Sequence, residues 1–245
     1  YQIAMRCIEK NKHIFIEKPI AQTVLEADKI VKFSKEKKII GQVGHVERFN
    51  PAYKAIKKII GNPMFIESHR LAEFNPRGTD VSVVLDLMIH DIDIILSLIS
   101  SKIKNISSSG VSVISDTPDI ANARIEFQNG AVANLTASRI SLKNMRKLRF
   151  FQKETYISVD LYNKKVEVVK MIDAPNKLDE FSLTLENAEG KKKQILFKSP
   201  EIINYNAIQI ELESFANSIN NDKKSIVSLE DATKALKVAY SIINS

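Results

Sequence analysis

The clearest pattern of apolar and polar positions runs from Val83 to Ile99. Apolar residues recur there at intervals of three and four, which predicts a helix with one continuous apolar face. The polar residues are spaced by four, four, three and four positions, so at about 100° per residue they share one narrow stripe. The apolar face contains Leu85, Met88, Ile89, Ile92, Ile95, Leu96 and Ile99, and the polar stripe contains Ser82, Asp86, His90, Asp93 and Ser97.

The polar stripe has two interpretations. A solvated helix face is the ordinary one. Solvated faces are usually rich in Lys, Glu and Arg, however, and none of these occurs between Arg77 and Lys102, in a chain with 27% charged residues. Short acids and a histidine suit a partly buried polar site, because an acid four residues from a histidine can fix its tautomer and raise its basicity. Asp86 and His90 are therefore candidates for acid-base chemistry.

The first 44 residues alternate between helix and strand. Residues 1–10 have the spacing of a helix end, and the β-branched run 13–17 predicts a short buried strand. Thr23 and Glu26 form a capping box for the next helix, which ends in the lysine-rich segment 35–38. Residues 39–44 form the second strand. Strand, helix and strand at this spacing predict a βαβ unit with parallel pairing.

The rest of the chain is mostly strands. Asn50 and Pro51 start a helix over 52–60, residues 64–73 are extended, and 74–80 form a loop. Asn129 and Gly130 predict a hairpin turn. So many strands in succession predict a large, mainly antiparallel sheet, with helices on one face and self-association available to the other. Helices over 205–219 and 228–243 close the chain, the second with Ser228 and Asp231 as a capping box. The predicted strands are 106–115, 120–128, 131–139, 146–151, 155–161, 165–171, 180–187 and 193–197.

Composition narrows the possible functions. The chain has 245 residues, 44% hydrophobic residues and a formal net charge of +7, within the ordinary globular range. Its lysines are spread over surface turns without arginine-aromatic alternation, so we expect no nucleic-acid partner; the charge could attract an anionic small molecule instead.

No apolar run is long enough for a membrane span, and we expect no membrane partner. The single Cys7 favours a reducing compartment such as the cytoplasm. Closely spaced His and Cys ligands are absent from the sequence, so we expect no metal site.

Three motifs occur in a recognisable order. Glu-Lys-Pro at 17–19 ends a predicted strand, Gly-His-Val-Glu-Arg-Phe-Asn-Pro-Ala-Tyr at 44–53 follows the next one, and an Asp, His and Asp lie within 86–93 on the predicted helix. Together they resemble the glucose-fructose oxidoreductase and inositol dehydrogenase family, Gfo/Idh/MocA. Residues 119–138 resemble the central hairpin of that family.

The resemblance implies an α/β fold: the C-terminal part of a Rossmann domain, then an α/β domain with a large, mainly antiparallel open sheet. It also implies that Lys18, Asp86 and His90 surround the reacting carbon. Oxidation of a secondary alcohol needs a base for the hydroxyl proton. We expect His90 to be that base, Asp86 to be its partner or the ligand of a neighbouring hydroxyl, and Lys18 to polarise the substrate oxygen.

The expected cofactor is NAD or NADP, with contacts from Glu17, Lys18, Pro19 and Arg48. His45 and Arg48 follow the second strand, where this family crosses between domains, and either could contact cofactor or substrate. Arg48 is equally suited to an ion pair that joins the domains.

The chain departs from the family in its glycines. None of its seven glycines forms the Gly-x-Gly-x-x-Gly turn that binds a dinucleotide. We therefore expect an N-terminally truncated member. Residues 1–47 would be the remnant of the Rossmann domain, 48–226 the substrate and oligomerisation domain, and 227–245 a terminal helix that packs back on the Rossmann part.

The expected activity is oxidation of a secondary hydroxyl of a sugar or nucleotide sugar by hydride transfer. Residues 44–51 look most like members that act on nucleotide-linked amino sugars, such as UDP-N-acetylglucosamine 3-dehydrogenases. The alternative is a non-catalytic oligomerisation module, or a fragment that lacks cofactor binding. We expect a homodimer or homotetramer formed through the open sheet.

Overall fold

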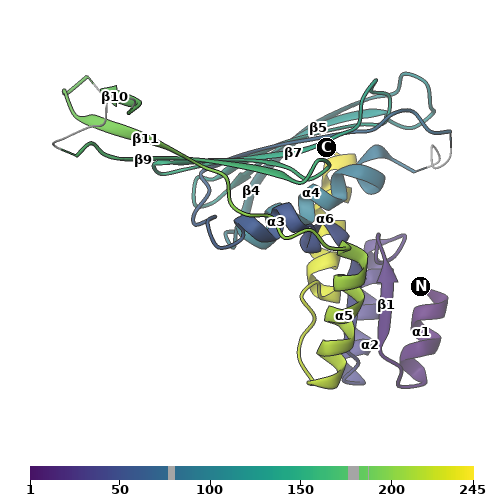
Figure 1. The fold of residues 1–245 in the computed structure, drawn as a ribbon. Helices are drawn as coiled ribbons and strands as arrows, with labels where there is room; N and C mark the ends of the chain where they lie inside the picture. Colours follow the sequence, from purple (N-terminus) through teal and green to yellow (C-terminus); the bar gives the residue numbers. More distant parts are fainter. Residues whose placement is uncertain (77–80, 176–181, 187) are drawn as a thin grey trace.

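The computed structural model describes residues 1–76, 81–175, 182–186 and 188–245. A broad sheet lies across the top of Figure 1, with helices packed beneath it. A smaller α/β part, which contains the N-terminus, extends below those helices.

The N-terminal part contains the predicted βαβ unit. Its elements are α1 (Gln2–Glu9), β1 (Ile14–Glu17), α2 (Val24–Glu36) and β2 (Gly41–Gly44). β1 and β2 pair in parallel, with Glu17 opposite Gly44, so the predicted parallel pairing is confirmed. The capping box is confirmed too: the Thr23 hydroxyl oxygen accepts from the Glu26 N–H at 3.2 Å, and a Glu26 carboxylate oxygen accepts from the Thr23 N–H at 3.1 Å.

In the described residues the large sheet has nine strands, in the order β10-β11-β9-β8-β7-β3-β6-β5-β4. Among the described strands of this sheet, only β3 and β6 pair in parallel, so the mainly antiparallel sheet is confirmed. Residues 180, 181 and 187 of one predicted strand, and 77–80 of the predicted loop, lie outside the described residues. The strands are β3 (Phe65–Leu71), β4 (Ile103–Val111), β5 (Ile120–Phe127), β6 (Val132–Ser138), β7 (Met145–Gln152), β8 (Thr155–Asp160), β9 (Lys165–Asp173), β10 (Thr184–Glu186) and β11 (Lys192–Lys198).

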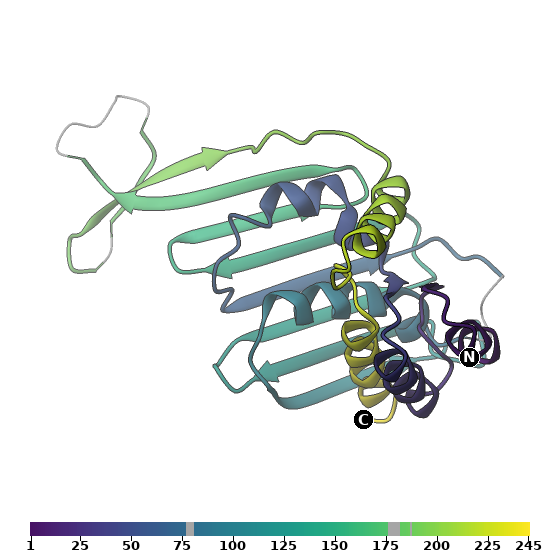
Figure 2. The ribbon, with the colours of Figure 1, turned by 90° about the horizontal axis from the view of Figure 1, so that it is seen from below.

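The two faces of the sheet differ. On β5, Ala123 and Ile125 are fully buried, whereas Arg124 between them is exposed. Helices cover the buried face, and Figure 2 shows α3 (Pro51–Ile56) and α4 (Ile89–Leu98) lying across it. In the described part of the chain no helix covers the other face. Gly130, at φ +86°, makes the predicted turn between β5 and β6, a conformation that glycine adopts without strain.

The segment 83–99 is not one regular α-helix. A π-helical turn (Val84–Met88) precedes α4, and the Ile89 N–H donates to the Val84 carbonyl five residues earlier. Such a turn holds one residue more than an α-helical turn, which shifts the phase of the positions around it. The prediction of a single polar stripe was therefore wrong. Asp86 and His90 line one cavity, and Asp93 and Ser97 line another.

The other helices largely follow the predictions. A 3-10 turn (Val46–Phe49) leads to α3, which begins after the Asn50 cap as predicted but ends at residue 56 rather than 60. Ser228 caps the last helix by accepting from the Asp231 N–H at 3.2 Å, and the Asp231 carboxylate accepts from the Ser228 hydroxyl. No helix in the described residues combines the length and apolar character needed to cross a membrane. The last two helices are α5 (Ala207–Asn220) and α6 (Leu229–Ile243).

Buried polar groups join the N-terminal part to the helices that follow it. Gln42 on β2 donates from Nε2 to the main-chain oxygen of Glu211 on α5 at 2.8 Å, and both residues are buried. Arg48 lies with Nε 3.8 Å from Oδ2 of Asp93 on α4, and it donates to the main-chain oxygen of Ile226 at 3.2 Å. This seam fixes α4 and α5 relative to the parallel strands.

Two carboxyl groups at the seam have raised pKa values. Burial raises the pKa of Glu211 to about 8, and the neighbouring Glu17 and Asp93 add to the rise. Burial raises the pKa of Asp93 to about 7 in spite of Arg48, and Asp231 contributes. Both shifts follow from the cost of placing a charged carboxylate where water is excluded.

The raised pKa of Glu211 makes stability depend on pH. The folded protein keeps this proton up to about pH 8, whereas an unfolded chain releases it near pH ~4.3, so wild-type stability falls as pH rises through this window. Glu211→Gln keeps a neutral side chain of similar shape. We predict that the Tm of Glu211→Gln, minus that of the wild type, increases from about pH 5 to pH 8 in thermal melts followed by circular dichroism. Each kcal/mol of stability that the wild type loses corresponds to roughly 2–4 °C of this difference.

Glu213→Gln is the matched control, because Glu213 lies two positions away on α5 and is exposed. Its Tm difference from the wild type should stay constant over the same pH range. A constant difference for Glu211→Gln as well would show that Glu211 is not the group responsible.

Candidate active site

Lys18 lies at the point where β1 ends. Pro19 stops the strand because it cannot donate to the ladder, and the Lys18–Pro19 peptide is cis. The Lys18 ammonium donates to the main-chain oxygen of Asp86 at 2.6 Å and to its Oδ1 at 3.1 Å. These residues are 68 positions apart, and the contact joins the N-terminal part to the π-helical turn.

Asp86 contacts Lys18 rather than His90. Both predicted residues belong to the described part of the chain, and no hydrogen bond joins them there. The structure thus does not show Asp86 as the partner of His90, because its carboxylate is directed to the Lys18 ammonium. The other expectation, that Asp86 binds a neighbouring substrate hydroxyl, stays a prediction.

Two imidazole rings lie next to each other in this region. The ring of His45, which follows β2, meets that of His90 edge-on with centroids 5.9 Å apart. Burial, Arg48 and Lys18 lower the pKa of His45 to about 3. Burial, Arg70, Lys18 and other cationic neighbours lower the pKa of His90 well below its ordinary value. Both rings are therefore neutral at neutral pH, the form in which an imidazole accepts a proton.

A buried ion-pair network adjoins His90. Arg70 on β3 contacts both carboxylate oxygens of Asp91 at 3.0 and 2.8 Å, and Oε1 of Glu47 at 2.9 Å. Burial alone would lower the pKa of Arg70, but Asp91 and Glu47 outweigh burial and raise the pKa above its ordinary value. Arg146 on β7 reaches the same Glu47 oxygen at 3.2 Å. The network holds α4 against the sheet.

Most of these side chains line one cavity of about 300 Å³, although His45 and Asp91 are not part of its lining. A cation can polarise a hydroxyl group, and a neutral imidazole lining the same cavity can accept the hydroxyl proton. The cavity therefore has the groups that alcohol oxidation requires. Its lining residues are Glu17, Lys18, Gly44, Val46, Glu47, Arg70, Leu71, Ala72, Asp86, Leu87, His90, Asn144 and Arg146.

The cavity fits the reacting end of a nicotinamide dinucleotide. Glu17 ends β1 and Gly44 ends β2, and both line the cavity. Ligands of open α/β sheets bind at this carboxyl edge of parallel strands. A nicotinamide ring against Lys18 would adjoin His90. The contacts predicted for Glu17 and Lys18 are compatible with this position and stay predictions. The predicted contact of Pro19 also stays a prediction, but Pro19 is not among the residues that line the cavity.

Arg48 lies apart from Lys18. It lines a separate cavity of about 190 Å³ with Asp93, Leu96, Ser97, Asp231 and Lys234, none of which lines the cavity of Lys18. Its contacts with Asp93 and Ile226 agree with the alternative prediction, in which Arg48 forms an ion pair that joins the two parts. Its predicted cofactor contact has no support from this geometry.

Sequence reasoning found Lys18, Asp86 and His90 but missed the charged residues around them. Those are Glu47, Arg70, Asp91 and Arg146. One signal was present for Arg70: it shares the helix-facing side of β3 with Ile66 and Ser68, and a charge on a buried face requires a partner. The alternation of buried and less buried residues along β3 does not tell which acid is the partner. No group of three or more His, Cys, Asp or Glu in the described residues is arranged to hold a metal ion.

Comparison with known proteins agrees with the motifs. A model described as GFO/IDH/MocA C-terminal domain matches residues 52–157, and one described as oxidoreductase family, NAD-binding Rossmann fold, matches residues 1–45. UDP-N-acetylglucosamine 3-dehydrogenase from Acidithiobacillus ferrooxidans is 34% identical over 169 residues, which are 69% of this chain and 54% of that protein.

Two further matches, one of them a solved structure of the same enzyme, cover nearly the whole chain. A solved structure of the Acidithiobacillus ferrooxidans enzyme superimposes with a TM-score of 0.86 at 27% identity, covering 98% of this chain and 73% of that one. Scyllo-inositol 2-dehydrogenase (NAD(+)) from Bacillus subtilis is 27% identical over 262 residues, covering 98% of this chain and 70% of that protein. The segment that matches the sequence of the Acidithiobacillus ferrooxidans enzyme spans about half of that protein's length. From its motifs, its two matching family models and its fold, the chain belongs to the Gfo/Idh/MocA family of oxidoreductases.

Proposed function

We propose that the protein containing this chain oxidises a secondary hydroxyl of a sugar or nucleotide sugar by hydride transfer to NAD or NADP. One observation carries the proposal: Lys18 from the N-terminal part and Asp86 and His90 from beyond β3 line one cavity at the carboxyl ends of two parallel strands. The description of the N-terminal family model and the name of the Bacillus subtilis relative support the cofactor.

In this proposal the substrate hydroxyl lies between Lys18 and His90. His90 is neutral and accepts the hydroxyl proton, while Lys18 stabilises the developing alkoxide. Asp86 orients Lys18 through the 3.1 Å ion pair. When bound, nicotinamide supplies the hydride acceptor.

The substrate class rests on cavity size and on the relatives. A cavity of about 300 Å³ is at the lower limit for small-molecule sites, which suits a single ring lined by polar groups. The named substrates of the two relatives are a nucleotide-linked amino sugar and an inositol. The first is favoured because that relative has the higher identity. A cytoplasmic location, inferred from the single cysteine, is part of the same proposal.

A non-catalytic oligomerisation module is the weaker alternative. Self-association does not require a lysine, an acid and a neutral histidine around one cavity. The open face of the sheet does favour self-association in addition to catalysis. An apolar row crosses six strands there, in direct register, and consists of Val132, Phe65, Phe151, Tyr156, Val169 and Phe197.

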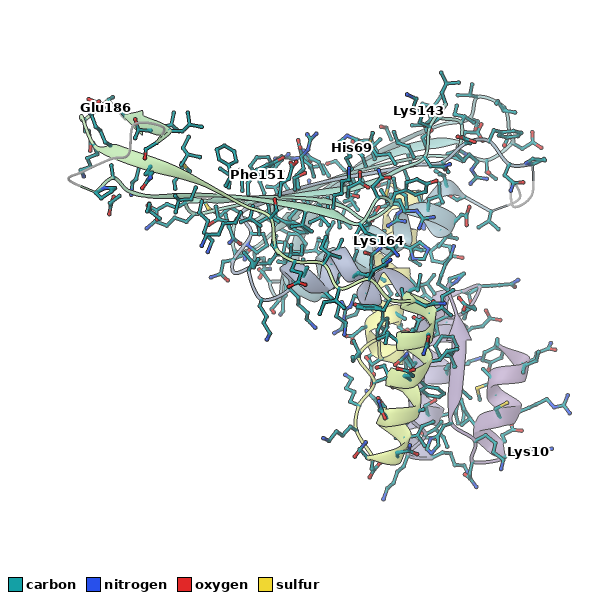
Figure 3. All side chains as sticks on the ribbon, in the orientation of Figure 1. Lys10, His69, Lys143, Phe151, Lys164 and Glu186 are labelled. Carbon is teal, nitrogen blue, oxygen red and sulfur yellow. The ribbon has the colours of Figure 1, made fainter. Side chains whose placement is uncertain are left out.

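The row makes this face suitable for contact with a second copy of the chain. Phe151 packs its ring against Phe65 and Tyr156, with centroids 5.9 and 5.0 Å away, and Figure 3 shows Phe151 on the sheet. Phe197 at the end of the row is 68% exposed. Contiguous exposed apolar surface of this kind marks interaction sites. We propose a homodimer or homotetramer formed through this face.

Replacement of His90 or Lys18 should remove most of the activity. For His90→Ala we predict a loss of about 10²–10⁴ in kcat/KM, typical of a missing general base, and for Lys18→Met about 10²–10³.

Because the pKa of His90 lies well below 6.5, wild-type kcat/KM should persist as pH falls past that value and decline only at lower pH. Initial rates of NADH or NADPH formation over a pH series measure both effects.

His69→Ala is the control for His90, because His69 lies on β3 with its side chain on the opposite side of the strand from the buried Arg70, and it does not line the cavity. Lys29→Met on α2 is the control for Lys18. Both should retain wild-type rates. Unchanged turnover in Lys18→Met and His90→Ala would refute the assigned roles.

Phe151→Asp should disrupt the oligomer. A charge in the middle of the apolar row would have to be desolvated on association, so we predict a shift to the monomer mass in sedimentation velocity at micromolar concentration. Leu142→Asp is the control, since Leu142 is 95% exposed and lies off the strands. A monomeric wild type, or the same mass for both variants and the wild type, would contradict the proposal.

A further inference from the structure

Arg146 occupies an unusual position in the sheet. It lies directly opposite Arg70 in the pairing of β7 with β3, although like charges in that position repel. The two guanidinium groups differ in exposure: the Arg70 side chain is 4% exposed and that of Arg146 is 47% exposed. Arg70 is therefore a buried structural group, whereas Arg146 can meet a ligand.

Glu47 holds Arg146 in place. One Glu47 oxygen accepts from both arginines, and the other accepts from the Asn50 side chain at 3.0 Å. Glu47 is buried, so its carboxylate has a fixed direction. Arg146 is anchored through NH1 to Glu47, and its guanidinium carbon lies 5.9 Å from the centre of the Tyr162 ring. These contacts restrict the guanidinium group before a ligand binds, which lowers the entropy cost of binding.

In the described part of the chain, the three cations of the cavity lining are matched by three carboxylates, and Arg146 is the most exposed of the three cations. Lys18 has Asp86 as its own partner, and Arg70 has the bidentate Asp91. Among the described lining residues, Arg146 is the cation that shares its carboxylate with a second arginine. Glu17 is also in the lining, but it is exposed, so water screens its charge.

The size of the cavity indicates which part of a ligand Arg146 meets. About 300 Å³ holds a sugar ring but not a whole nucleotide sugar, so a large substituent would have to leave the cavity past its partly exposed lining. Arg146 and Asn144 both lie on or next to the start of β7 and line the cavity. A planar guanidinium group binds two oxygens of a phosphate or carboxylate at once.

We propose that Arg146 binds an oxyanion carried on a substituent of the sugar, outside the ring that is oxidised. This inference rests on the proposed sugar-binding function of the same cavity. It makes Arg146 a specificity-determining residue: it selects substrates that carry a phosphate or a carboxylate over neutral sugars. Phosphate and carboxylate are two sources of one chemistry, and the choice of ligands in the test separates them.

The test is calorimetric titration of three ligands without turnover: UDP-glucose for a phosphate, glucuronate for a carboxylate, and glucose as the neutral sugar. It uses the protein containing this chain, with NADH present at saturation, so that no hydride acceptor is available and the sugar is not oxidised. For Arg146→Gln we expect the Kd of the charged ligand that binds to rise about 10- to 100-fold, the usual effect of losing a charge-assisted hydrogen bond. The Kd of glucose should change less than threefold. Arg146→Lys should recover part of the loss because it keeps the charge but not the planar fork.

Arg149→Gln is a closely matched control. Arg149 lies on the same strand, is 46% exposed, and pairs with Glu67 at 3.3 Å, which closely parallels the 47% exposure and 3.2 Å contact of Arg146. The odd spacing of three places it on the opposite face of the sheet. It should bind all three ligands as the wild type does. Thermal melts of each variant establish that the fold is retained.

The possible outcomes separate this inference from the proposed function. A selective loss of UDP-glucose or glucuronate binding in Arg146→Gln supports the inference, even if no sugar is ever oxidised. Equal losses in Arg146→Gln and Arg149→Gln, equal losses for glucose and the charged ligands, or no binding of any charged ligand to the wild type would overturn it. A rise of the Kd for NAD itself in Arg146→Gln would assign the residue to the cofactor and also overturn it.

Discussion

The buried guanidinium group of Arg70 is the constraint on which the site depends. A charge at this depth is tolerated only when its partners are close and well oriented. Asp91 supplies a bidentate contact from α4, and Glu47 supplies another from the turn after β2. Three segments of the chain therefore have to meet at β3. Because His90 is adjacent to Asp91 in sequence, the ion pair that fixes α4 also fixes the imidazole. Loss of one partner would leave the other charge uncompensated, at a cost of about 3–5 kcal/mol.

The features that were predicted from the sequence are those set by neighbouring residues. The Thr23 capping box, the Gly130 turn and the successive strands each depend on residues within a few positions of one another. Lys18 and Asp86 were predicted together for a different reason: their motifs occur in the order typical of a known family. The contacts of Arg70 have neither kind of signal. Its partners lie 21 and 23 positions away, and nothing in the alternation of β3 tells which acids they are. The long-range charge pairing was therefore not predictable from this sequence.

The π-helical turn explains why only part of the predicted polar stripe, Asp86 and His90, lines the cavity of Lys18, whereas Asp93 and Ser97 line another cavity. The stripe assumed a constant 100° per residue, and the turn over 84–88 changes the angle where Asp86 is placed. The main-chain oxygen of Asp86 accepts a hydrogen bond from Lys18 at 2.6 Å. π-turns often occur at functional sites because they disturb the regular pairing of the helix and present groups differently. Here the turn presents both a carbonyl and a carboxylate to one ammonium group. A regular helix would keep its carbonyls for its own N–H groups.

The acids of this region separate into two classes, and the separation organises the charge of the site. Glu47, Asp86 and Asp91 each contact a cation within 3.2 Å. In the described residues, neither Glu211 nor Asp93 at the seam contacts a cation within that distance, and Arg48 lies 3.8 Å from Asp93. Burial raises the pKa of both carboxyl groups. Negative charge is thus held beside the arginines and Lys18, and it is suppressed where the N-terminal part meets α4 and α5. The lowered negative charge at the seam allows close packing of the two parts without competing for Lys18. The ammonium group stays directed to Asp86 and the cavity, in the position where a substrate oxygen would need it.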